Sequence, residues 1–214
     1  MMIKQKKNVY IVGAGQLGVL VSNILKEDKN YKIVGFIDTK KKIKNKINGI
    51  KIFKSEAGFL KNDKIKKYFF LAIGNISARE KIIKKFNNKN VKFLKLIEKN
   101  VKLGKKTTIG RGSIILNSSI ILNNTRIGNF VIVGTSTIIL HNVRIGNNCI
   151  VGGGSKIGAN TNFEKNILVG VGSVFSSNKK KIGENSIICS GTVIHKTIKK
   201  NSKLIGNPAR YIPR

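Results

Sequence analysis

The 214-residue sequence contains two cysteines, two prolines and no tryptophan. Two isolated cysteines, Cys149 and Cys189, exclude a disulfide framework or a cysteine-based zinc site, and we expect both to be small core residues in a reducing cytosol. No apolar stretch approaches the ~20 residues that a membrane-spanning helix needs. Residues 1–7 lead directly into a strand pattern, without the apolar segment of a signal peptide. We therefore expect a cytoplasmic protein without membrane insertion.

Acidic residues are also scarce, with 9 aspartates and glutamates against 42 lysines and arginines and a formal net charge of +33. Nucleic acid is the usual partner of such a charge. However, the lysines follow polar positions throughout the first half, and only Arg111, Arg126 and Arg144 are basic between residues 107 and 155. Neither an arginine-rich strip nor an aromatic platform for bases is present. The distribution argues against nucleic-acid binding and favours biased composition with a general attraction for small anions.

The first half of the chain alternates strand and helix patterns. Strand-like runs alternate with two helical stretches in the order 8–12, 19–25 (helical), 32–37, 68–73, 77–86 (helical) and 91–97. Strands that alternate with helices form a parallel sheet with helices on its faces. We therefore predict a small Rossmann-like α/β domain over residues 1–98.

The second half repeats with a period of six residues. Thirteen large apolar residues follow one another at this spacing from Leu103 to Phe175, and small or branched residues recur four positions after them. One extra residue shifts the register, and the period resumes at Ile182. A β-solenoid has this period, because each short strand turns one aliphatic side chain inward before the chain turns a corner. Residues 99–214 are therefore predicted to form a parallel β-helix.

A glycine-rich turn with the spacing G-x-G-x-x-G occupies residues 13–18, between the first strand and the first helix. Such a turn presents the amides of a helix N-terminus to a phosphate group. Asp38 follows about 20 residues later, as a ribose ligand of NAD does. About 90 residues is nevertheless short for a complete dinucleotide fold. An NAD-dependent enzyme, a binder of another nucleotide and a turn without a ligand all stay open at this point.

The hexapeptide run and the ending Gly206-Asn207-Pro208-Ala209-Arg210 resemble the left-handed β-helix acyltransferases. The glycine-rich turn, the segment 35–38, and the segment 72–75 followed by Arg79 resemble the sugar O- and N-acetyltransferases. This family includes sialic-acid O-acetyltransferases and enzymes that N-acetylate UDP-4-amino-sugars. The resemblance implies a left-handed β-helix, a homotrimer, acetyl-CoA as co-substrate, no metal, and a nucleotide-sugar-binding N-terminal domain.

The family resemblance also assigns roles to individual residues. His141, one of two histidines in the chain, matches the family's catalytic base, and Asn142 follows it. Ile150 and Val171 match contacts to acetyl-CoA. The positions that match the nucleotide-sugar site are Gly15, Gln16, Leu17, Asp38, Thr39 and Gly74.

Two departures from the family pattern affect the expected activity. The residue after the family's histidine is usually an acid, whereas Asn142 carries no charge, and a second histidine is replaced by Ile150. A neutral amine tolerates a weaker base than a hydroxyl does, so we expect N-acetylation of a nucleotide-linked amino-sugar in surface-glycan biosynthesis. Sugar O-acetylation and a degenerate, non-catalytic trimeric nucleotide-sugar binder are the alternatives.

Overall fold

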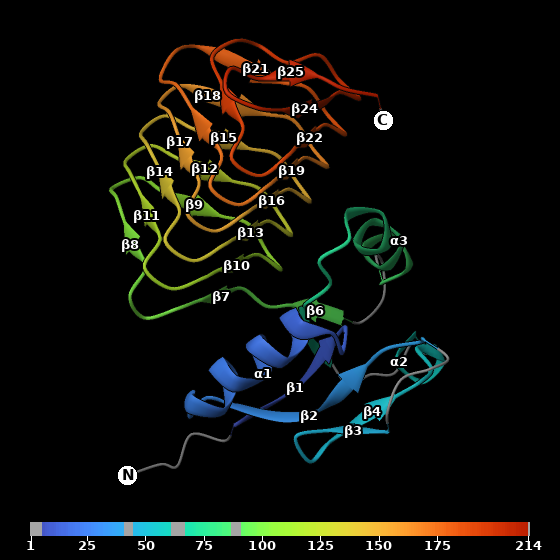
Figure 1. Ribbon diagram of the computed structural model, residues 1–214. Helices are drawn as coiled ribbons and strands as arrows, with labels where there is room; N and C mark the ends of the chain where they lie inside the picture. Colours follow the sequence, from blue (N-terminus) through green and yellow to red (C-terminus); the bar gives the residue numbers. More distant parts are fainter. Residues whose placement is uncertain (1–5, 41–44, 61–66, 87–90, 214) are drawn as a thin grey trace. The chain divides into compact units, whose positions relative to one another are not determined.

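The computed structural model describes residues 6–40, 45–60, 67–86 and 91–213. The chain forms two compact units, Met1–Leu94 and Lys95–Arg214. The sequence placed the boundary after residue 98. The strand Leu96–Ile97 pairs with the solenoid strand Ile114–Ile115, which is why the second unit begins earlier. Each unit is described by itself below (Figure 1).

The first unit is a mostly parallel six-stranded sheet in the order β3-β4-β2-β1-β5-β6. Its elements are β1 (Lys7–Val12), α1 (Gln16–Glu27), β2 (Tyr31–Ile37), β3 (Lys46–Ile47), β4 (Ile50–Phe53), α2 (Ala57–Leu60), β5 (Lys67–Leu71), α3 (Ile76–Phe86) and β6 (Val91–Phe93). Strand β1 lies between β2 and β5, so the chain leaves it first toward one edge of the sheet and later toward the other. Ligands of such sheets bind at the carboxyl ends of the strands where this reversal occurs.

The pattern at residues 91–97 predicts one strand, and this is wrong. The structure has two strands there, β6 in the first unit and β7 (Leu96–Ile97) in the second, which pair with β5 and β10 respectively. A run of alternating apolar residues does not reveal that its two ends pair with different sheets. The β3–β4 hairpin and the single-turn helix α2 have no strong periodicity and were not predicted.

The second unit is a β-solenoid of very short strands. They are β7, β8 (Lys102–Leu103), β9 (Thr108–Ile109), β10 (Ile114–Ile115), β11 (Ile120–Ile121), β12 (Arg126–Ile127), β13 (Ile132–Val133), β14 (Ile138–Ile139), β15 (Arg144–Ile145), β16 (Ile150–Val151), β17 (Lys156–Ile157), β18 (Thr161–Phe163), β19 (Leu168–Val169), β20 (Val174–Phe175), β21 (Lys180–Ile182), β22 (Ile187–Ile188), β23 (Val193–Ile194), β24 (Lys203–Ile205) and β25 (Arg210–Tyr211).

From β7 to β23 every third strand pairs in parallel, which creates three sheets. At the C-terminal end β24 stacks in parallel on β22, and β25 pairs antiparallel with β24. Face 1 contains β7, β10 and the strands that stack on them up to β25. Face 2 contains β8, β11, β14, β17, β20 and β23, and face 3 contains β9, β12, β15, β18 and β21. The predicted solenoid fold is therefore confirmed.

The inward side chains follow the period of six. Of the large residues, Leu103 on the first coil is 46% exposed, whereas those from Ile115 onward are buried. The small residues at the second inward position are fully buried, and their hydroxyls donate to carbonyls of the next corner, as Ser113 Oγ does to the Gly128 oxygen at 2.9 Å. These bonds satisfy polar groups that would otherwise be buried without a partner.

The corners adopt a left-handed backbone conformation at every sixth residue. Asparagine is frequent there because it tolerates positive φ better than other non-glycine residues. A second set of glycines follows the large inward residues and does not have positive φ: Gly110, Gly128, Gly134, Gly146, Gly152 and Gly170. A Cβ on Gly134 would lie 2.4 Å from the backbone nitrogen of Gly153 on the next coil. These glycines are needed for close stacking of the coils.

Candidate functional site

A cavity of about 660 Å³ lies at the carboxyl ends of β1, β2 and β5 in the first unit. All six residues that the family resemblance assigns to the nucleotide-sugar site line it. They are Gly15, Gln16, Leu17, Asp38, Thr39 and Gly74. Residues from three separate segments thus converge on one cavity.

Each of the three glycines in the G-x-G-x-x-G turn is required for a different structural reason. A Cβ on Gly13, whose φ is +103°, would lie 2.5 Å from the Ala72 carbonyl oxygen, and one on Gly18 would lie 2.1 Å from the Gly13 oxygen. Gly15 has nothing within 4 Å of its Cβ position and is the N-cap of α1. The outer glycines therefore allow close packing, and the middle one leaves the N-terminus of α1 open toward the cavity.

The Asp38 carboxylate holds the glycine-rich turn in place by a hydrogen bond. One of its oxygens accepts a hydrogen bond from the Ala14 amide at 2.9 Å, and the other accepts one from the Lys40 amide at 3.1 Å. Each carboxylate oxygen can accept a second hydrogen bond, so Asp38 retains acceptor capacity for a ligand.

Charged residues of the cavity that the sequence analysis missed come from α3 and from the segment before α2. Lys81 and Lys85 extend from α3, and Lys85 donates to the carboxylate of the buried Glu56. Arg79 on the same helix is fully buried, and its Nη1 donates to the Ile73 carbonyl oxygen at 2.9 Å, below the cavity wall at Gly74. The i, i+4 spacing of Lys81 and Lys85 was the available signal, but it is also typical of any solvated helix face.

His141 is exposed at the corner between β14 and β15, where face 2 meets face 3. The next residue, Asn142, has φ +58°, and its Nδ2 donates to Asn160 Oδ1 at 3.2 Å. The left-handed backbone conformation thus explains why an asparagine stands here, and its neutral side chain leaves His141 without an acidic residue directly after it.

Ile150 and Val171 lie on other parts of the prism. Ile150 points outward from face 1 between Ile132 and Leu168, and Val171 is 62% exposed at the corner between faces 1 and 2. A single chain therefore does not bring the residues matched to acetyl-CoA together with His141.

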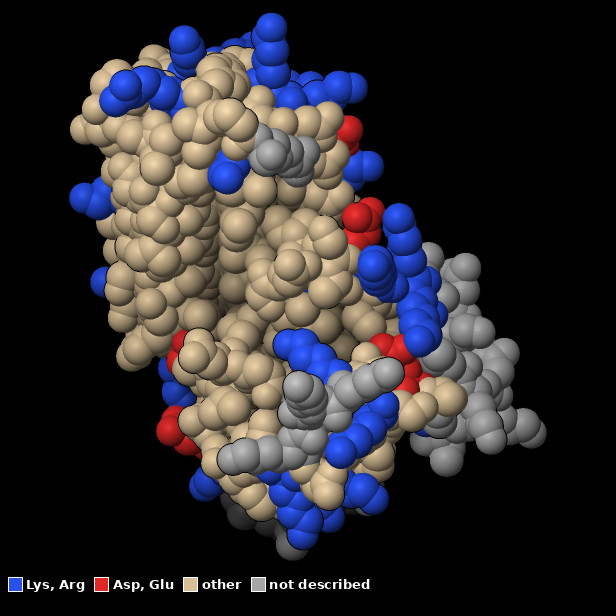
Figure 2. Space-filling view, turned by 45° about the vertical axis from the view of Figure 1, so that its right-hand side comes forward, with Lys and Arg blue, Asp and Glu red and all other residues tan. Residues whose placement is uncertain are grey.

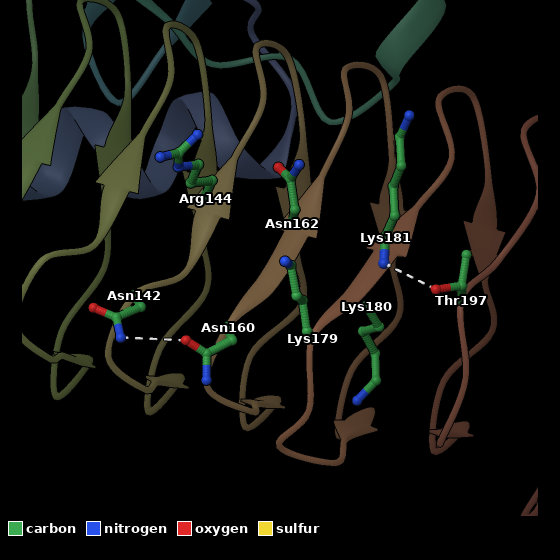
Figure 3. Close-up of a pocket in the computed structure, with 8 residues that line it drawn as sticks. All are labelled: Asn142, Arg144, Asn160, Asn162, Lys179, Lys180, Lys181 and Thr197. Atoms are coloured by element: carbon green, nitrogen blue, oxygen red, sulfur yellow. Dashed lines mark hydrogen bonds between the residues drawn. The ribbon is translucent and has the colours of Figure 1, made fainter.

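A groove of about 840 Å³ follows face 3 from the corner after His141 toward the C-terminal coils (Figure 3). Basic and amide side chains line it, including Asn142, Arg144, Asn160, Asn162, Lys179 and Lys181. This groove was not predicted from the sequence, because Arg144 and the lysines at 179–181 are far apart in the chain and meet only when the coils stack.

In the part of the chain that the structure describes, no group of three or more histidine, cysteine, aspartate or glutamate side chains could hold a metal ion. Among these same residues, no helix is both long and apolar enough to cross a membrane.

The fold defines a hexapeptide-repeat solenoid protein with an N-terminal α/β domain, and comparisons with family models agree. Residues 8–86 match the PglD N-terminal domain, and residues 124–159 match the bacterial transferase hexapeptide (six repeats). The first match lies within the first unit and the second match lies within the solenoid. No curated protein sequence matches the chain.

Several solved structures share the fold over nearly the whole chain. The acetyltransferase domain of PglB from Neisseria gonorrhoeae is 21% identical, with a TM-score of 0.87 over 97% of this chain and 100% of that one. WeeI from Acinetobacter baumannii is 23% identical, with a TM-score of 0.87 and coverages of 96% and 100%. A histidine-to-alanine variant of GDP-perosamine N-acetyl transferase from Caulobacter crescentus, in complex with CoA and GDP-perosamine, is 20% identical, with a TM-score of 0.86 and coverages of 97% and 98%. The predicted family resemblance is confirmed.

Proposed function

We propose that this protein is a cytoplasmic acetyl-CoA-dependent acetyltransferase that acts on the amino group of a nucleotide-linked amino-sugar. The observation that carries the proposal is the cavity of the first unit, where all six predicted nucleotide-sugar residues converge. The similarity to acetyltransferases that share both units supports the reaction class. Biosynthesis of surface glycans is the corresponding biological role.

The cavity suits a nucleoside diphosphate group. Amides at the open N-terminus of α1 favour phosphate oxygens, and no acidic residue stands in the first turn of the helix to oppose them. Lys81 adds a positive charge on the opposite element. The remaining acceptor capacity of Asp38 is available for a hydroxyl or a base edge.

His141 acts in this proposal as the general base. Its neutral imidazole accepts the proton of the sugar amine as the amine nitrogen attacks the carbonyl carbon of the acetyl thioester. The C–N bond forms, the C–S bond breaks, and the thiolate of coenzyme A leaves and takes up a proton. Backbone amides of the solenoid stabilise the oxyanion formed during the attack.

A homotrimer brings the separated residues together. The outward side chains of face 1 form an apolar row (Ile132, Ile150, Leu168, Ile187). Those of face 2 are mainly apolar (Ile120, Ile138, Val174, Val193), with Lys102 at the start of the row and Lys156 between Ile138 and Val174. Those of face 3 include Arg126, Arg144 and Lys181. The flank of the solenoid visible in Figure 2 is almost free of charged side chains. Two neighbours around a three-fold axis would pair the apolar row of face 1 with the mainly apolar face 2 of the next protomer. This pairing would bring the face that carries Ile150 toward the edge of face 2 at which His141 stands.

The second candidate is a non-catalytic nucleotide-sugar binder. Asn142 favours it, because the residue after His141 then carries no carboxylate that could strengthen the base. O-acetylation of a sugar hydroxyl is a third candidate and demands a stronger base than an amine does.

The test is release of CoA thiol from acetyl-CoA with a panel of nucleotide-linked amino-sugars and sialic acid. We expect release that depends on one amino-sugar and falls at least about 100-fold in His141→Ala. His195→Ala is the matched control, because His195 is also an exposed solenoid histidine and should retain activity. Turnover of His141→Ala within a few-fold of the wild type would refute the assignment of the base.

A further inference from the structure

The groove on face 3 concentrates cations in a way that the solenoid fold does not require. Arg144 lines the groove and is followed in the same row by Asn162 and Lys181; its other ladder partner, Arg126, lies next to the groove and does not line it. Like charges directly opposite each other destabilise a sheet, and outward positions of a solenoid accept any polar residue. The row therefore costs stability that threonine or asparagine at these positions would avoid.

Within the described residues, the charges of the groove are only partly neutralised. Lys181 Nζ lies 2.7 Å from Glu164 Oε1, and this hydrogen bond, followed by one from the Glu184 amide, lowers the pKa of Glu164. No carboxylate among those residues pairs with Arg144 or Lys179, and none lines the groove. Arg144 and Lys179 thus have no carboxylate partner among the residues that the structure describes.

Hydrogen-bond donors accompany the two free cations. Figure 3 shows Arg144, Asn162 and Lys181 in a row on successive strands, whereas the Lys180 amine points the opposite way. The Thr197 hydroxyl oxygen accepts a bond from the Lys181 amide at 3.2 Å, so its hydrogen is available to another acceptor. The groove thus offers several donors to a ligand with many acceptor oxygens: Arg144, Lys179, the side-chain amides of Asn142, Asn160 and Asn162, and this hydroxyl.

We propose that the face-3 groove is a binding site for a phosphate ester or diphosphate, held by Arg144 and Lys179. A phosphate group combines the negative charge that these residues lack with oxygens for the guanidinium fork and the amides. At about 840 Å³ the groove holds a nucleotide-sized molecule. The phosphate groups belong either to coenzyme A, a source that rests on the proposed function, or to a separate nucleotide.

Isothermal titration of the full-length protein with CoA, 3′-dephospho-CoA, ADP and pantetheine tests the site. We expect Arg144→Gln/Lys179→Gln to weaken binding of the phosphorylated ligands about tenfold or more and to leave pantetheine unaffected. The matched control is Arg111→Gln/Lys105→Gln, which removes the same residue types outside the groove and should change affinity less than about twofold. Thermal unfolding of each variant shows that the fold is retained.

An equal loss of affinity in both double variants would overturn the proposal, because the net charge of +33 alone would then explain binding. Absence of wild-type binding to any phosphorylated ligand would also overturn it. Groove-dependent binding of CoA, with a smaller effect on 3′-dephospho-CoA, identifies the coenzyme as the source. Groove-dependent binding of ADP alone identifies a separate nucleotide.

The outcome is separable from that of the proposed function. If the wild type releases CoA thiol and the Arg144→Gln/Lys179→Gln variant keeps its affinity and KM for acetyl-CoA, the groove proposal fails and the reaction stands. If ADP binding depends on the groove but no acceptor supports thiol release, the site stands and the reaction fails.

Discussion

At the corners of the solenoid, the left-handed backbone conformation restricts which residue can stand at a position, whatever its chemical role. Asn142 departs from the acid expected after the candidate base, yet its φ of +58° and its hydrogen bond to Asn160 explain why an asparagine stands there. The sequence shows the missing charge but not the conformation of the backbone. Replacing Asn142 by glutamate would therefore change stability together with any change in the strength of the base.

Lys180 occupies an inward position where other coils have small residues, and it is 4% exposed. Its Nζ donates to Ser176 Oγ at 3.0 Å, and burial lowers its pKa from the ordinary 10.5. Lys180 thus has one pKa in the unfolded chain and a lower pKa in the folded state. At a pH below both pKa values, the amine is charged in both states and the folded state bears the cost of a buried charge. Between the two values the folded state has released the proton and the unfolded state retains it, so stability rises with pH in this window.

We predict that Lys180→Met, which keeps the length of the side chain, is more stable than the wild type at pH 7. The gain should shrink as the pH approaches 10, because the wild-type amine then becomes neutral in the folded state. Urea unfolding at pH 7 and 9.5 measures both quantities. Lys181→Met, on the exposed side of the same strand, should show no gain, and a gain that is independent of pH would contradict this explanation.

At the scale of elements, stacked corner asparagines join successive coils. Asn148 Nδ2 donates to Asn166 Oδ1 at 2.8 Å, Asn166 donates to Asn185 and Asn185 to Asn201, both at 3.2 Å. All four residues have positive φ. The ladder therefore combines a conformational preference with hydrogen bonds between coils.

Asn166→Ala should lower the free energy of unfolding by about 2 kcal/mol, because it removes two ladder bonds and places alanine in the left-handed region. Asn166→Gly removes the same bonds without the steric penalty and should cost about half as much. Urea unfolding of both variants separates the two contributions. Equal losses would mean that the backbone conformation contributes nothing.

The solenoid was predictable from the sequence because its fold depends on local repetition. Each inward position is specified by a residue six places away, so the period from Leu103 onward fixes the coils. The glycine turn and Asp38 were predictable for a similar reason, since they follow consecutive strands. Lys85 and Glu56 meet through tertiary packing, which no spacing in the sequence encodes.

At the scale of the whole molecule, the three faces of the prism differ in character. Face 1 turns a continuous row of isoleucine and leucine outward, face 2 a mainly apolar row that Lys156 interrupts, and face 3 carries the cationic row. Scattered apolar residues are normal on a protein surface, but contiguous rows are typical of interfaces. The trimer proposal rests on this difference.

Ile138→Lys on face 2 should convert the proposed trimer to monomers and abolish turnover, because the charge would be buried between protomers without a partner. Thr108→Lys, an outward position on face 3, adds the same charge and should leave the assembly intact. Sedimentation velocity gives the oligomeric state. A wild-type monomer that is fully active would contradict the trimer proposal.

The extra residue in the solenoid has a consequence for how this architecture can change. Partners in the ladder are 18 residues apart up to Lys156↔Val174, and 19 apart at Phe163↔Ile182, Leu168↔Ile187 and Val174↔Val193. They are 16 apart at Ile187↔Lys203, and the strands stay parallel throughout. The insertion thus behaves like a frameshift that is corrected within one side of a single coil. Chain length can therefore vary at a corner while the strands on either side stay paired in parallel, so new loops can be added beside the groove without rebuilding the prism.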